Sequence, residues 1–128
     1  MNDLLEKSKE LLEEARQCFN DGEKECAVSQ LELAVRKALS ALESEFGVSG
    51  FGKPLDERIA RFTNDQQLIN IGKIIDDLFN PAIYPAGYDH ATDDPEFSFG
   101  QVVTIFNYAN EIIKFAEKKM KESDGILR

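Results

Sequence analysis

The sequence has little of the side-chain chemistry on which most enzymes depend. Its 128 residues include one histidine, His90, two cysteines and no tryptophan. A single histidine leaves no local Ser-His-Asp or Cys-His pattern, and it excludes the two-histidine helix of zinc proteases. The di-iron bundle signature, a Glu-x-x-His motif on each of two helices, is also missing. We therefore expect no metal or other cofactor, and the residues by themselves identify no catalytic group.

Long hydrophobic stretches and targeting signals are missing as well. The longest apolar runs, such as residues 102–106, are far shorter than the ~20 residues that span a bilayer. The N-terminus lacks the basic region that opens a signal peptide. Cys18 and Cys26 match no zinc-binding spacing and are expected to be buried thiols, although the turn between them would allow a disulfide. These features predict a cytoplasmic protein that does not enter a membrane.

Positive charge is scarce, since 24 acidic residues outnumber 15 basic ones and give a net charge of −9. Residues 63–101 contain one base, Lys73, against seven acids. Bulk nucleic-acid binding is therefore unfavourable, because it needs a broad basic surface. Four lysines near the C-terminus are interpreted as the cationic end of a helix, with a local basic patch as the alternative. These are Lys114, Lys118, Lys119 and Lys121.

Apolar residues recur along most of the chain at the spacing of amphipathic helices, and no segment shows the alternation of a strand. The short turn at 20–22 predicts that the first two helices form an antiparallel hairpin, packed closely through alanines. The predicted fold class is all-α: an antiparallel four-helix up-and-down bundle with one additional short helix. We expect a single domain with its core in residues 3–122. The expected helices span about residues 3–19, 23–46, 54–62, 64–79 and 94–122.

Two helix starts are predicted from capping patterns. Thr63 and Gln66 have the spacing of a capping box, in which each side chain binds the other residue's backbone N–H. Asp94 followed by proline is a typical N-terminal pair for the last helix. Gly100, just inside that helix, could delay its regular start to Ser98.

Other polar and glycine-rich features are interpreted as structural. The glycine cluster at 47–54 follows a helix and lacks the spacing of a phosphate loop, so it is expected to be a flexible connector. The pair at 76–77 is expected to be a solvated surface. Four further side chains could hold a divalent cation, but acids ahead of a helix are explained more simply as capping and dipole partners. These are Asp89, His90, Asp93 and Asp94.

The apolar content is high enough to leave surface for a second subunit. Leu4 beside Leu5, and Phe97 near Phe99, are the residues that indicate it. We therefore expect a homodimer.

The order of elements resembles a known family. An alanine-rich hairpin has the pattern Ala-x3-Leu-x2-Ala-Val-x2-Ala-Leu over residues 27–39, a glycine-containing loop and two helices follow, and residues 80–85 read Asn-Pro-Ala-Ile-Tyr-Pro. A long final helix contains Asn-Tyr-Ala-Asn-Glu-Ile-Ile at 107–113. Over residues 4–120 this is similar to the HEPN superfamily of small prokaryotic helical proteins, and the tyrosine–proline step before the last helix is its most telling part.

The resemblance implies a specific place for an active site. Many HEPN proteins are metal-independent endoribonucleases that use an arginine, a nearby polar residue and a histidine, brought together from two protomers. Here Asn80 fits the polar position, whereas Phe79 stands in place of the arginine and Tyr84 in place of the histidine. Phenylalanine cannot stabilise developing phosphate charge, and a tyrosine with a pKa near 10 is a poor base at neutral pH. His90 has no arginine at the family spacing before it.

Several functions remain open at this point. The resemblance favours a non-catalytic interaction module that pairs with a nucleotidyltransferase or another protein, in a toxin–antitoxin or defence-type system. In some such pairs the transferase modifies a tyrosine near the motif, which makes Tyr84 and Tyr88 candidates, although both could simply pack the loop onto the bundle. The alternatives are an endoribonuclease with an atypical site around Asn80, Tyr84 and His90, a tetratricopeptide-like scaffold, and a small-ligand site in the bundle.

Overall fold

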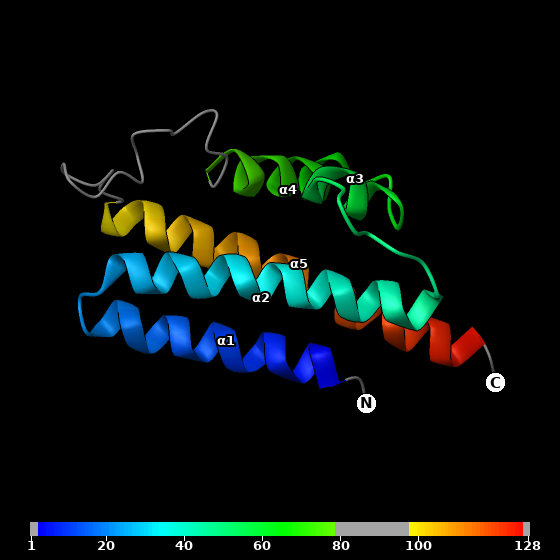
Figure 1. Cartoon of the computed structure of the whole chain (residues 1–128), viewed down its shortest axis with the longest axis horizontal. Helices are drawn as coiled ribbons and strands as arrows, with labels where there is room; N and C mark the ends of the chain where they lie inside the picture. Colours follow the sequence, from blue (N-terminus) through cyan, green and yellow to red (C-terminus); the bar gives the residue numbers. More distant parts are fainter. Residues whose placement is uncertain (1–2, 79–97, 127–128) are drawn as a thin grey trace.

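The fold is built from helices throughout the residues that the computed structural model describes, 3–78 and 98–126, and these contain no strand. The helices are α1 (Asp3–Asn20), α2 (Lys24–Phe46), α3 (Leu55–Ala60), α4 (Gln66–Leu78) and α5 (Phe99–Ile126). In Figure 1, α1 and α4 run in one direction while α2 and α5 run in the other. This arrangement confirms the predicted all-α up-and-down bundle with one short additional helix.

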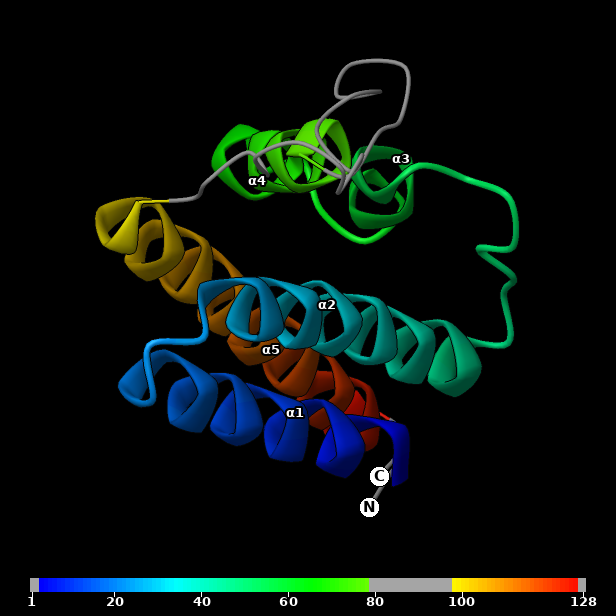
Figure 2. The same ribbon diagram turned by 60° about the vertical axis from the view of Figure 1, so that its left-hand side comes forward.

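Helix α2 is the central element of the bundle. It packs along α1 and α5, and α3 and α4 form a second layer over α2 and α5, as the rotated view in Figure 2 shows. Its alanines explain this position, because small side chains let neighbouring helices approach closely. Ala34, Ala38 and Ala41 are fully buried against leucines of α1 and the second half of α5.

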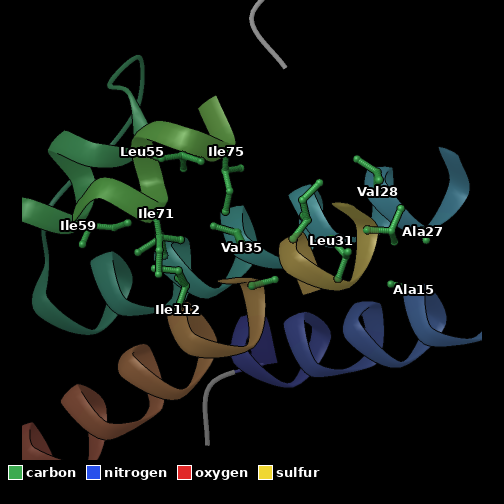
Figure 3. Packing of buried hydrophobic residues seen from close by; sticks show 14 residues of the cluster. Ala15, Ala27, Val28, Leu31, Val35, Leu55, Ile59, Ile71, Ile75 and Ile112 are labelled. Carbon is green, nitrogen blue, oxygen red and sulfur yellow. The ribbon is translucent and has the colours of Figure 1, made fainter. Parts of the chain in front are cut away.

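A second group of buried residues joins the two layers. Figure 3 shows Ile71 and Ile75 of α4 pointing toward Val35 of α2 and Ile112 of α5. Gly72 allows α4 to approach α3, since a Cβ there would lie 2.7 Å from Cδ1 of Ile59. The apolar stripes predicted for α4 and α5 therefore face this core.

The buried face of α1 includes Leu5, which was expected to leave apolar surface uncovered. Leu5 is fully buried and Leu4 only partly, so Leu5 is not part of an exposed apolar surface. Ser8 is buried as well, and its hydroxyl donates a hydrogen bond to the carbonyl oxygen of Ala34 at 2.8 Å. This bond satisfies the only polar atom that the serine side chain brings into the alanine-lined contact.

The predicted start of α4 at Thr63 is wrong. Oδ1 of Asp65 accepts hydrogen bonds from the backbone N–H groups of Gln67 at 2.9 Å and Leu68 at 3.4 Å, so Asp65 is the N-cap. The Thr63 hydroxyl instead accepts from the N–H of Asp65 at 3.1 Å. Aspartate places a charged acceptor at the positive end of the helix dipole, which threonine cannot do.

Helix α5 begins with a capping box at the later of its two predicted starts. The Ser98 hydroxyl accepts from the N–H of Gln101 at 3.1 Å, and the Gln101 side chain accepts from the N–H of Ser98 at 2.8 Å. The alternative start at Asp94 and Pro95 lies outside the described residues.

The two cysteines correct another expectation. Cys18 and Cys26 form a disulfide, with their Cα atoms 5.8 Å apart, and no free cysteine occurs in the described residues. The turn after α1 brings the last turn of one helix beside the first turn of the next, within the range that a disulfide bridges. Sequence spacing alone allowed this pairing but did not require it.

Asp76 is not the solvated surface residue that the sequence indicated. Its carboxylate accepts a hydrogen bond from the N–H of Leu55, at the first turn of α3, and lies 3.4 Å from the Arg36 guanidinium of α2. Burial raises the pKa of the Asp76 carboxyl, while the Leu55 hydrogen bond and Arg36 oppose that rise. The residue thus links α4, α3 and α2.

One surface ion pair gives the fold a defined dependence on pH. The Lys9 ammonium of α1 donates to the Glu117 carboxylate of α5, and this hydrogen bond holds the Glu117 pKa below its usual 4.5. A lowered carboxyl pKa stabilises the fold above the unfolded-state value, and that stability is lost as the pH falls through the folded-state value.

We expect Lys9→Met to lower the free energy of unfolding by up to about 1 kcal/mol at pH 7, because the pair is partly exposed. The difference from the unmodified protein should shrink as the pH falls below about 4.5. Urea unfolding followed at several pH values measures it. The same substitution at exposed Lys7, on the same helix, is the control; equal pH profiles for the two variants would contradict the assignment.

Candidate functional site

The residues predicted to form the site lie outside the described part of the chain. They are Phe79, Asn80, Tyr84, Tyr88 and His90. What the structure does describe is how the segment that carries them is attached. It leaves α4 after Leu78 and rejoins the bundle at Ser98, where the capping box fixes the first turn of α5.

These two attachment points lie toward the same end of the bundle as the turn between α1 and α2 (Figures 1 and 2). The disulfide between Cys18 and Cys26 is at this turn and connects α1 to α2. Helix termini and a covalent cross-link therefore converge at this end. We call it the loop end of the bundle.

Aromatic rings contact one another and two cations at the loop end. The rings of Phe19 and Phe99 meet edge to face, with centroids 5.4 Å apart. The Lys24 ammonium lies 4.8 Å from the centre of the Phe99 ring, and the Arg16 guanidinium lies 4.8 Å from the centre of the Phe106 ring. A cation over the face of an aromatic ring is attracted electrostatically by the ring, so each contact stabilises the two side chains against each other.

Phe99 remains half-exposed despite these contacts, and Val103, one turn further along α5, is also exposed. Phe99 and Val103 therefore leave apolar area uncovered at the start of α5. The expectation that Phe99 leaves apolar surface uncovered is therefore met, whereas Phe97 lies outside the described residues.

A buried ion pair, which the sequence did not reveal, anchors the glycine-rich connector at the other end. Nε and Nη2 of Arg58 donate to the two carboxylate oxygens of Glu43, at 2.8 and 2.7 Å, and Nη2 also donates to the Ser40 hydroxyl at 3.3 Å. A Cβ at Gly50 would overlap this pair, so the glycine lets the connector pack over it. The connector at 47–54 is thus held in place at Gly50, contrary to the simple flexible linker that its composition predicted.

No chemical signal in the sequence distinguishes Glu43 and Arg58 from surface charges. Both belong to helices with many charged residues, and each becomes buried only when α3 folds back onto α2. The position of Gly50, seven residues after Glu43, was the only available hint. This pair is a structural element, because both charges are satisfied by each other.

The described residues contain neither a cluster of metal ligands nor a helix suited to cross a membrane. Among residues 3–78 and 98–126, no three histidine, cysteine, aspartate or glutamate side chains gather in a way that could hold a metal ion. None of the helices in those ranges combines the length and apolar character that crossing a membrane requires.

Comparisons with known proteins agree on the fold. The archaeal HEPN homologue ST0689 superposes with a TM-score of 0.77 and 20% identity, covering 92% of this chain and 95% of that one. The protein TT1696 from Thermus thermophilus superposes with a TM-score of 0.73 and 22% identity, covering 93% and 99%. Identities this low establish similarity of fold alone. No curated protein matches the sequence.

The sequence itself matches the family model of the HEPN domain over residues 1–119. This range includes all of α1 to α4 and most of α5, so the match covers nearly all of the packed bundle. The helix order, the alanine-rich central hairpin and the family match together show that the chain belongs to the HEPN domain family.

Proposed function

We propose that this protein is a non-catalytic HEPN interaction module, which acts as a homodimer and pairs with a nucleotidyltransferase or another partner protein. The observation that carries the proposal is the lack of an arginine near the only histidine. The nearest arginine before His90 is Arg61, 29 residues upstream. A local arginine–histidine motif of the kind that HEPN ribonucleases use therefore has no arginine to supply it.

The arginines in the described part of the chain already have partners in the bundle. Arg58 is paired with Glu43 in the interior, Arg36 contacts Glu32 and Asp76, and Arg61 donates to a connector carbonyl. Of these described arginines, only Arg16 lies at the loop end, where it packs on Phe106. This distribution favours a binding role over phosphate-transfer chemistry.

The exposed apolar residues at the loop end support binding of a second copy or of a partner protein. Phe99 and Val103 expose apolar area at the loop end of the bundle. A second copy or a partner protein that covers this area would remove it from water, and apolar burial is the main driving force for association. A light-scattering mass near 14.4 kDa at micromolar concentration would contradict the dimer.

This proposal predicts that the protein has no ribonuclease activity. We expect the purified protein to leave structured and single-stranded RNA intact under conditions in which a known HEPN ribonuclease cuts them. Sequencing gels over several hours measure this. Cleavage that His90→Ala abolishes, while Tyr108→Phe leaves it unchanged, would instead support the atypical endoribonuclease. Tyr108 is the control because it lies within α5 and outside the candidate motif.

Capture of the partner tests the other half of the proposal. The tagged protein is purified from its native host, and both the co-purifying proteins and its own intact mass are determined by mass spectrometry. A nucleotidyltransferase in the eluate, or a mass increment that maps to Tyr84 or Tyr88 and not to Tyr108, supports the paired module. An unmodified protein that repeatedly elutes alone contradicts it.

A further inference from the structure

A small cavity opens between α1, α2 and the first turns of α5, at the loop end of the bundle. Its volume is about 320 Å³, at the lower limit of the range typical of small-molecule sites. The walls are mainly apolar and include Phe19, Leu31, Val102 and Phe106. All residues that line it belong to the described helices.

The polar side chains around the cavity are one guanidinium and two carboxamides, with no carboxylate among them. Arg16 is the only charged side chain in the lining, and the amides of Asn20 and Asn107 are the only other polar side chains there. Arg16 is held beside the cavity because its guanidinium packs on the Phe106 ring. Its acidic neighbour Glu13 lies 3.4 Å away on the exposed surface of α1 and is not part of the lining.

This charge pattern is unusual for the molecule. The chain carries nine more acidic than basic residues, yet no carboxylate lines this cavity. Two other hollows on the described surface mix both signs: one is lined by Asp65 and Glu111 together with lysines, and the other contains Glu43 together with arginines. Of these three, the apolar cavity alone combines a hydrophobic interior with a single sign of charge in its lining.

We propose that this cavity binds a small amphipathic monocarboxylate, with its apolar body between α1 and α5 and its carboxylate on the Arg16 guanidinium. Planar guanidinium donors match the two oxygens of a carboxylate, and the asparagine amides offer further donors. The apolar walls exclude water from the body of the ligand, which contributes the larger part of the binding. This proposal goes beyond the proposed partner function: the cavity lining comes from α1, α2 and α5, and it shares Val103 with the exposed apolar surface of α5.

Three probes with one apolar body and different head groups test the proposal. They are 4-phenylbutyrate, the neutral 4-phenylbutanamide and the cationic 4-phenylbutylamine, titrated into isotope-labelled full-length protein and followed by amide chemical shifts. We expect saturable binding of the carboxylate, about three- to tenfold weaker binding of the amide, and the weakest binding of the amine. The largest shifts should come from the end of α1 and the first turns of α5, and not from the far end near Met120.

Two matched arginine variants separate the charge from the fold. Arg16→Gln should reduce the affinity for the carboxylate to that for the amide and leave the amide unaffected. Arg61→Gln, at an exposed arginine outside the cavity, should change neither. Circular dichroism checks that both variants remain folded, which is expected because Arg16 is half-exposed.

Equal affinity for the three probes, equal effects of the two variants, or shifts located elsewhere would each overturn the carboxylate site. None of these results would bear on the interaction-module proposal, whose tests use RNA and partner capture. Conversely, a protein that cleaves RNA would leave the cavity measurement unaffected.

Discussion

Arg58→Ala is expected to lower the free energy of unfolding by about 3–5 kcal/mol, the largest effect of any single charge removal in the described helices. The substitution leaves the Glu43 carboxylate buried without its two hydrogen-bond donors. Both side chains are less than a tenth exposed, so water cannot replace the lost bonds without opening the contact between α2 and α3. Chemical denaturation followed by circular dichroism measures the change.

The neighbouring arginine provides the matched control. Arg61 lies three residues further on, is exposed and donates one hydrogen bond to the Ser49 carbonyl. Arg61→Ala should cost about 1 kcal/mol or less. Similar losses for the two alanine variants would show that burial of the Arg58–Glu43 pair does not determine its contribution.

A double variant shows whether the loss of stability comes from the missing attraction between Arg58 and Glu43 or from the buried charge that a single variant leaves unpaired. Arg58→Met combined with Glu43→Met removes both charges and fills similar volumes with apolar atoms. We expect the double variant to be more stable than either single variant, because no unpaired buried charge remains. A double variant whose loss equals the sum of the single losses would contradict this explanation.

Leu39→Ala is expected to lower the free energy of unfolding by about 2–5 kcal/mol. Leu39 lies on α2 and is fully buried in the cluster that joins the two helix layers. Truncation removes apolar contacts and leaves a cavity that the surrounding helices can close only in part. Thermal and urea unfolding of the variant provide the measurement.

Leu33→Ala is the control for this truncation. The same helix carries Leu33 with 41% of its surface exposed, so the chemical change is identical while the burial differs. Its effect should be within about 0.5 kcal/mol. Comparable losses at the two positions would mean that helix propensity, and not burial, explains the result.

The family and the fold class could be read from the sequence to a large extent. The apolar stripes of α4 and α5 and the alanine pattern of α2 are local repeats, and a helix of given periodicity has only one apolar face to bury. The turn after Asn20 then fixes an antiparallel hairpin. The family match over residues 1–119 agrees with the resemblance drawn from these same segments.

The predicted site, by contrast with the fold, is not tested by the described residues. Its residues, from Phe79 to His90, are identified by analogy with a motif, and they lie outside the described part of the chain. The prediction that this motif is degenerate therefore rests on residue types: a phenylalanine where the family motif has arginine, and a tyrosine where it has histidine. The experiments on RNA cleavage and tyrosine modification decide it.

The sequence by itself determined the helices, their order and their apolar faces, because these depend on contacts between residues three or four positions apart. Only the tertiary structure decided which charges are buried, which acid caps which helix, and where the surface is hollow. Asp76 meets the first turn of α3, and Arg58 meets Glu43, only after the chain has folded back on itself. These two pairings join positions 21 and 15 residues apart, whose proximity no local pattern encodes.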